Sequence, residues 1–223
     1  MERKRIKSYV LRRGRMSDRE KRACKQHWHA YGLSLADVSA GFESIFENDN
    51  PVVMEIGFGT GENLVHMAQQ QPQTNFLGVE VFERGVAMTL NAIHDHKLDN
   101  VRILRLDAVE VLAACRDNSL HKCCLFFPDP WHKRKHNKRR LVTPKFLTLL
   151  SSKLCSDGVF HFATDWVEYA NTCEQQLRSS VEFSVVRVVS GGAHDELGRA
   201  ETKFERRGLE RGYIITDIVA VPT

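Results

Sequence analysis

Short apolar runs alternate with amphipathic stretches of helical length between residues 52 and 178, and this alternation constrains the fold more than any other feature of the chain. Five apolar runs have the length and composition of buried strands: Val52–Ile56, Phe76–Val81, Val101–Leu106, Cys123–Phe127 and Val159–Ala163. The stretches with helical spacing are Glu62–Gln70, Gly85–His96, Val109–Ala114, Pro144–Leu154 and Trp166–Arg178. Two later strands are predicted over Phe183–Val189 and Tyr213–Val221. This order predicts an α/β domain with a parallel sheet covered on both faces.

The length and composition fit one domain. A chain of 223 residues that is 42% hydrophobic can bury a sizeable core. We interpret residues 1–32 as a basic, mobile N-terminal extension and residues 33–223 as the folded domain. We expect no membrane span, because no apolar run reaches ~18 residues, and no secretory signal, because no apolar segment follows the basic N-terminus. Six cysteines without a C-x-x-C pair favour reduced thiols in a cytoplasmic protein.

Positive charge is concentrated in two segments. Residues 1–25 carry a net charge of +8 and residues 133–140 carry +6, within a chain whose total is +4. The remainder is therefore acidic. An acidic body with two localised basic segments is typical of a nucleic-acid-binding protein, and the alternative is a solvated tail and a solvated loop.

A glycine-rich turn follows the first predicted strand. It reads Glu55-Ile56-Gly57-Phe58-Gly59-Thr60-Gly61. A dinucleotide fingerprint would need its third glycine where Glu62 stands, and a carboxylate there would repel a diphosphate. The turn instead resembles the E-x-G-x-G-x-G motif of methyltransferases that use S-adenosylmethionine, a cofactor with a cationic amino acid end and a sulfonium but no phosphates. We therefore predict that Glu55, Gly57, Gly59 and Gly61 bind S-adenosylmethionine.

Two acids follow the next strands. Glu80 ends the second strand, 19 residues after Gly61, where a carboxylate can accept hydrogen bonds from ribose hydroxyls. Asp107 follows the third strand, where it can reach an adenine amino group. Ligands of open α/β sheets bind at these carboxyl ends, so we add both acids to the cofactor site. Solvated strand ends are the alternative.

A rigid turn and a basic run follow the fourth strand. Asp129 stands between Pro128 and Pro130, which fix the backbone around its carboxylate. Trp131 comes next, and residues 133–140 then hold six Lys/Arg and no acid. An acid and an aromatic ring beside a phosphate-binding run suggest a site that handles a nucleobase while gripping the polynucleotide.

Together with the glycine turn, Pro128-Asp129-Pro130-Trp131 resembles the signature of the bacterial tRNA (guanine-N7)-methyltransferase family. The resemblance covers almost the whole chain and includes Arg5-Ile6-Lys7-Ser8-Tyr9-Val10, Arg13-Gly14-Arg15, Gly78-Val79-Glu80-Val81, Asp107-Ala108-Val109-Glu110, Ala163-Thr164-Asp165-Trp166 and Thr202-Lys203-Phe204-Glu205. It implies a Rossmann-like class I fold with a seven-stranded, mostly parallel sheet whose last strand is antiparallel. It also implies methyl transfer from S-adenosylmethionine to N7 of a guanine in tRNA, in the variable loop.

The resemblance also assigns residues. Asp129 would be central to catalysis and, with Glu55, Glu80 and Asp107, would contact the cofactor. The target guanosine would be held by Lys133, Asp165, Thr202, Lys203, Phe204 and Glu205. RNA would be contacted by Lys135, His136, Asn137, Lys138, Arg139 and Arg140.

The chemistry agrees with these assignments. N7 of guanine is an unprotonated lone pair at neutral pH, so catalysis needs in-line positioning and carboxylates near the developing positive charge. Asp129 and Asp165 are the candidates, while Glu205 suits the N1–H and N2 amino edge of guanine. Trp131 or Phe204 could stack on the base, with a core role as the alternative for each.

The chain departs from the family where Arg211 and Tyr213 replace the usual Leu and His. Two alternatives to the main hypothesis are a divergent paralogue with another RNA or small substrate, and an inactive RNA-binding protein of the same fold. We expect no metal, because cations surround His132 and His136 and oppose metal binding. Both a monomer and a homodimer are compatible with the sequence.

Overall fold

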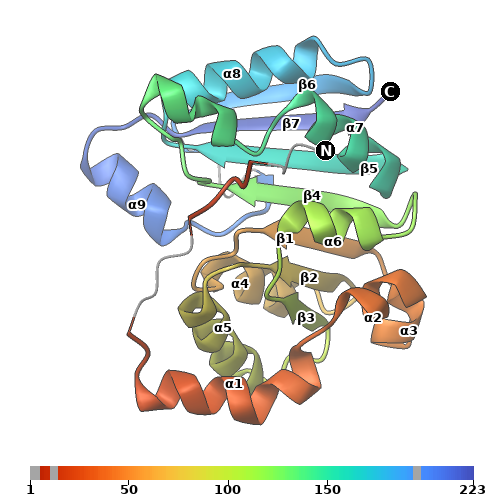
Figure 1. Ribbon diagram of the computed structural model, residues 1–223. Coiled ribbons are helices and arrows are strands. Elements are labelled where there is room, and N and C mark those ends of the chain that lie inside the picture. Colours follow the sequence, from red (N-terminus) through yellow and green to blue (C-terminus); the bar gives the residue numbers. More distant parts are fainter. Residues whose placement is uncertain (1–5, 11–14, 193–196) are drawn as a thin grey trace.

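The computed structural model describes residues 6–10, 15–192 and 197–223, and its centre is a seven-stranded sheet (Figure 1). The strand order is β3-β2-β1-β4-β5-β7-β6. The first five strands pair in parallel, and β7 runs antiparallel to both β5 and β6. Their bounds are Val52–Ile56 (β1), Asn75–Val79 (β2), Val101–Leu104 (β3), Leu120–Phe126 (β4), Leu154–Thr164 (β5), Phe183–Ser190 (β6) and Thr216–Pro222 (β7). The predicted sheet, with its antiparallel last strand, is confirmed.

Helices cover both faces of the sheet. The first face carries α1 (Asp18–Tyr31), α4 (Glu62–Gln70) and α5 (Glu83–Asp95), whose apolar side chains form one core cluster with the strands. The second face carries α2 (Leu35–Ala40), α3 (Phe42–Phe46), α6 (Ala108–Ala114), α7 (Pro144–Lys153) and α8 (Val167–Arg178), which build the other cluster. Strands buried on both faces explain the continuous apolar runs of the sequence.

The predicted mobile extension is wrong for residues 18–31, which form α1. Ser17 caps this helix in a capping box with Glu20, and Arg84 of α5 binds the Glu20 carboxylate at 2.8 Å. Ala23 is buried between α1 and α5. The helix was not predicted, because the segment is highly charged and its apolar face is narrow. Residues 1–5, 11–14 and 193–196 lie outside the described residues, and with them Arg5, Arg13 and Gly14 of the motifs near the N-terminus.

Two further helices fall in segments for which no helix was predicted. The 3₁₀ helix η1 (Arg134–Arg139) occupies the basic run, and α9 (Lys203–Glu210) begins at the Thr202-Lys203-Phe204-Glu205 motif. The hydroxyl of Thr202 caps α9 by accepting from the backbone N–H of Glu205 at 3.2 Å. In Figure 1, α9 lies beside the carboxyl ends of β4 and β5.

The strand order reverses at β1, which is flanked by β2 on one side and β4 on the other. The connection that leads to β2 and the connection that leads to β4 therefore run to opposite sides of β1. This divergence opens a crevice at the carboxyl ends of the strands, the usual ligand position in open α/β sheets.

Candidate active site

A cavity of about 220 Å³ lies at this crevice. Its walls come from the glycine turn after β1, the ends of β2 and β4, the loop after β4, the N-terminal segment and α9. Five of the predicted site residues line it: Gly57, Gly59, Glu80, Asp129 and Phe204. The wall is otherwise mainly apolar, as in small-molecule sites that orient a ligand with a few polar groups.

The backbone of the glycine turn requires glycine. Gly59 has φ +58°, in the left-handed region that L side chains rarely adopt. A methyl group on Gly85 of α5 would lie 2.1 Å from the carbonyl oxygen of Gly59, so α5 packs closely against the turn only because residue 85 is glycine. Sequence analysis missed the role of Gly85, since a single glycine in a first helical turn carries no distinctive signal.

Glu80 links the glycine turn to the end of β2. Its carboxylate accepts backbone hydrogen bonds from Gly59 at 2.9 Å, Val81 at 2.6 Å and Phe82 at 3.0 Å. Burial raises its pKa, those hydrogen bonds oppose the rise, and the nearby Asp129 carboxylate adds to it. The cavity therefore has two acids close together in its wall, which favours a ligand with positive charge.

Glu55 is buried behind the glycine turn. Burial raises its pKa to about 7, against the effect of a 2.8 Å hydrogen bond from the Asn63 amide. The Asn63 carbonyl in turn accepts from the backbone N–H of Ala200 at 2.8 Å. Asn63 thereby ties the segment before α9 to the glycine turn, a role that the sequence did not reveal. Glu55 lines a smaller adjoining cavity with Thr202, Lys203 and Phe204.

Asp129 lies on a loop with unusual backbone geometry. Phe127 and Trp131, which flank Pro128-Asp129-Pro130, have φ of 49° and 52°. Left-handed conformations at non-glycine residues are concentrated at functional sites, where the surrounding structure holds them. Asp129 is exposed at the cavity.

The two candidate aromatic residues lie in different environments. The Trp131 indole donates to the backbone carbonyl of Ser8 at 3.1 Å, and the Arg139 guanidinium lies 5.1 Å from its ring centroid. Trp131 thus holds the N-terminal segment, whose Ser8 and Tyr9 line the cavity. Phe204 is 53% exposed and lines both cavities, so it is the ring available to a base.

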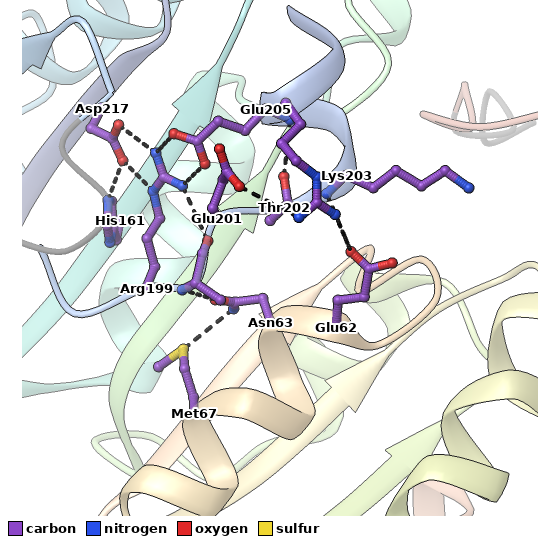
Figure 2. Close-up of polar contacts among 12 residues, drawn as sticks. Glu62, Asn63, Met67, His161, Arg199, Glu201, Thr202, Lys203, Glu205 and Asp217 are labelled. Carbon is purple, nitrogen blue, oxygen red and sulfur yellow. Dashed lines mark hydrogen bonds and ion pairs between the residues drawn. The ribbon is translucent and has the colours of Figure 1, made fainter. Parts of the chain in front are cut away.

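A buried ion network stands behind α9 (Figure 2). Arg199, fully buried, binds the Glu205 carboxylate at 2.5 and 3.0 Å and the Asp217 carboxylate at 2.7 and 2.8 Å. His161 of β5 shares a 2.8 Å hydrogen bond with Asp217. Burial opposes ionisation of Asp217, but Arg199 and His161 lower its pKa overall.

This network corrects the prediction that Glu205 reads the edge of guanine. The side chain is 0% exposed, and both of its carboxylate oxygens accept from Arg199. A buried carboxylate next to an arginine is stabilised by forming this pair, so Glu205 anchors α9 to the sheet. Arg199 lies three residues before the Thr202 motif, and the sequence offered no signal that its charge is buried.

Sequence comparison identifies the family. A family model described as "Putative methyltransferase" matches residues 49–218. A tRNA (guanine-N(7)-)-methyltransferase of Pseudomonas savastanoi pv. phaseolicola is 45% identical over 216 residues, 96% of this chain and 88% of that protein. One of Colwellia psychrerythraea is 38% identical over the same shares. The chain belongs to the tRNA (guanine-N7)-methyltransferase family.

Solved structures support the same fold at low sequence identity. The 16S rRNA methyltransferase KamB aligns with a TM-score of 0.63 and 14% identity, over 82% of this chain and 92% of that chain. TrmN of Thermus thermophilus aligns with a TM-score of 0.57 and 14% identity, over 92% of this chain and 52% of that chain. These likenesses establish a class I methyltransferase fold, which implies a methyl donor of the S-adenosylmethionine type.

In this family member the basic run presents only part of its charge to solvent. Lys135 and Lys138 are exposed. The Asn137 amide donates to Glu168 at 3.1 Å, and Arg139 donates to the backbone carbonyl of Lys7 at 3.4 Å. His136 packs edge-on against Trp131 with ring centroids 6.0 Å apart.

The environment of Arg140 differs from the one predicted for it. It was predicted to contact RNA, but its side chain is buried and its guanidinium donates to Pro130, Thr172 and Glu168. The guanidinium therefore faces the protein interior. The run of basic residues contains no pattern that indicates which side chain points into the protein.

Three further predicted residues, Asp165, Lys133 and Asp107, are not among the residues that line the cavity. Asp165 follows β5 and packs against α9, where a methyl group on Gly208 would lie 3.1 Å from its Cβ. Lys133 is exposed at the start of η1. Asp107 caps α6 by accepting from the Val109 N–H at 3.0 Å, and its neighbours Leu106 and Ala108 line the cavity.

Within residues 6–10, 15–192 and 197–223, no cluster of three or more His, Cys, Asp or Glu side chains could hold a metal ion. Over the same described ranges, no helix combines the length and apolarity needed to cross a membrane.

Proposed function

We propose that this protein transfers a methyl group from S-adenosylmethionine to N7 of a guanine in the variable loop of tRNA. The observation that carries the proposal is Asp129 on its strained loop, facing the acid-walled cavity at the topological switch point. Several curated relatives, 38–45% identical to this chain, bear the name of this activity.

The cofactor site comprises Glu55, Gly57, Gly59, Gly61, Glu80, Asp107 and Asp129. S-adenosylmethionine, when bound, supplies a methyl group on a positively charged sulfur. The glycine turn lets the ligand approach the backbone closely, because a side chain at Gly59 would enter the cavity wall. The acids attract the cationic ligand, since no lysine or arginine lines this cavity in the described part of the chain.

The substrate side comprises Lys133, Asp165, Thr202, Lys203 and Phe204. Phe204 stacks on the guanine, and Lys133 neutralises its phosphate. Asp129 stabilises the positive charge that develops on the base as N7 is methylated. No general base is required, because N7 of guanine carries no proton at neutral pH. Lys135, His136, Lys138 and Arg139 contact the RNA backbone around this site, and Asn137 supports them.

The test uses tRNA from a strain that lacks N7-methylguanosine, with purified protein and labelled S-adenosylmethionine. A methyl group at N7 labilises the base, so borohydride reduction followed by aniline cleaves the chain at that nucleotide. We expect one cleavage, in the variable loop. Methylation of another atom or RNA supports a divergent paralogue, and tRNA binding without any methyl transfer supports an inactive RNA-binding protein.

A further inference from the structure

Arg140 ends the basic run but turns into the protein. Only 5% of the residue is exposed, and its Nη2 atom is shielded from solvent. Its Nε donates to the backbone carbonyl of Pro130 at 2.9 Å, and its Nη1 donates to the Thr172 hydroxyl at 3.2 Å and to the Glu168 carboxylate at 3.4 Å. The guanidinium also lies 4.8 Å from the ring centroid of Tyr169.

These contacts join three parts of the active site. Pro130 follows Asp129 directly in the catalytic loop, whereas Glu168, Tyr169 and Thr172 belong to α8. Glu168 also accepts from Asn137 of η1 at 3.1 Å. The side chain of Arg140 is therefore the joint at which the catalytic loop and the RNA-facing helix η1 are both fixed to the rigid body of the domain.

The catalytic loop needs such a support. Left-handed conformations at Phe127 and Trp131 each cost on the order of 1 to 3 kcal/mol and persist only where surrounding contacts hold them. Pro128 and Pro130 have no backbone N–H, and the Phe127 N–H donates to the Ala163 carbonyl at 2.8 Å, so the Pro130 carbonyl offers a second anchor for this stretch. A charged donor on the Pro130 carbonyl forms a stronger hydrogen bond than a neutral one.

We propose that Arg140 is a positioning residue for Asp129 and makes no contact with RNA. It acts by holding the Pro130 carbonyl against α8, which sets the height and direction of the preceding carboxylate at the mouth of the cavity. The inference rests on the proposed function, because the readout is methyl transfer to tRNA.

The test compares Arg140→Met and Arg140→Lys with the matched surface variant Lys138→Ala. Both Arg140 variants are expected to lower kcat by about 100-fold, the scale of a misplacement of ~1 Å in a reacting geometry. Their salt dependence of tRNA affinity should match the wild type. Lys138→Ala should instead reduce the slope of log affinity against log salt by ~0.7, the value for one lost phosphate contact.

The opposite pattern overturns the proposal. If Arg140→Met reduces the salt slope as Lys138→Ala does and keeps the wild-type kcat, Arg140 is a phosphate contact. If neither Arg140 variant folds, Thr172→Val removes one neutral acceptor and leaves the arginine in place. It should lower kcat by about 3- to 10-fold, with an unchanged salt slope. An unchanged kcat in Thr172→Val would then contradict the proposal. Failure of the wild type to methylate tRNA refutes the proposed function itself, which separates the two claims.

Discussion

The two sides of the site hold their acids differently. On the cofactor side, Glu55 and Glu80 are held by neutral groups, the Asn63 amide and three backbone N–H groups, and burial raises both pKa values. On the C-terminal side, Glu205 and Asp217 share one buried arginine. The pKa of Asp217 is lowered there despite its burial.

This difference distinguishes acids that can bind a cationic cofactor from acids that stabilise the position of α9. Acids held by neutral donors have no cation as a partner, so a cationic cofactor can neutralise their charge when they ionise. The Glu205 and Asp217 carboxylates already accept hydrogen bonds from the Arg199 guanidinium, so they stabilise the position of α9 instead. The residue type alone does not decide the role of a carboxylate in this site, because the role depends on the charge of its partner.

The largest expected effect is on the paired side. Arg199→Met leaves two buried carboxylates without their cation and should reduce the free energy of unfolding by about 3 to 5 kcal/mol. Urea unfolding followed by circular dichroism measures this loss. A loss below about 1 kcal/mol would mean that the two acids are not stabilised by Arg199, and the comparison would fail on this side.

Asp129 should show the converse behaviour. Asp129→Asn keeps the shape of the side chain but removes its charge, so methyl transfer should fall by ~100-fold. The free energy of unfolding should change by less than about 0.5 kcal/mol, because the side chain is exposed. Single-turnover assays and urea unfolding of the same preparation check the two values. Near-normal turnover would leave Asp129 with a purely structural role.

A smaller effect is expected at Glu55, where both the free energy of unfolding and the affinity for S-adenosylmethionine should depend on pH. The folded protein keeps the Glu55 proton up to about pH 7, whereas the unfolded chain loses it near 4.5. Glu55 therefore contributes to the free energy of unfolding below pH 4.5. This contribution is lost as the pH rises towards 7, because between these values only the folded state holds the proton. Ionised Glu55 should favour the cationic cofactor, so S-adenosylmethionine affinity should rise about tenfold from pH 6 to pH 8.

Glu55→Gln provides the control for this pH effect. Its affinity for S-adenosylmethionine should be nearly flat over the same range, and isothermal titration calorimetry at matched ionic strength compares the two proteins. Equal slopes in the variant and the wild type would exclude Glu55 as the titrating group. The Arg199 network adds no slope of its own through Asp217, whose pKa is lowered and whose stabilising effect is lost only in acid.

The sheet and the cofactor side could be predicted because local sequence determines them. Apolar runs specify the buried strands, and Glu80 follows a strand whose carboxyl end must face the crevice. The glycine turn was also recognisable, since its residues are adjacent in the chain. Asn63 was missed because its partners, Glu55 and Ala200, come together only in the folded domain.

The arginines could not be predicted for the same reason. Arg140 sits among solvent-exposed cations in the sequence, yet it is buried by α8, which begins 27 residues later. Arg199 has no acid beside it except Glu201, and its partners Glu205 and Asp217 come from α9 and β7. Long-range pairing of buried charges depends on tertiary packing, which periodicity and motif spacing do not report.

The most direct test of the comparison is the effect of Glu205→Gln on two quantities measured together, the free energy of unfolding and the KM for tRNA. Glutamine has the same shape but no charge to pair with Arg199. The account predicts a loss of about 2 kcal/mol or more in unfolding free energy, the scale of a lost charged hydrogen bond, with a KM within about twofold of wild type under folding conditions. Unchanged stability with a KM raised tenfold or more would show that Glu205 contacts the guanosine, and would contradict the account.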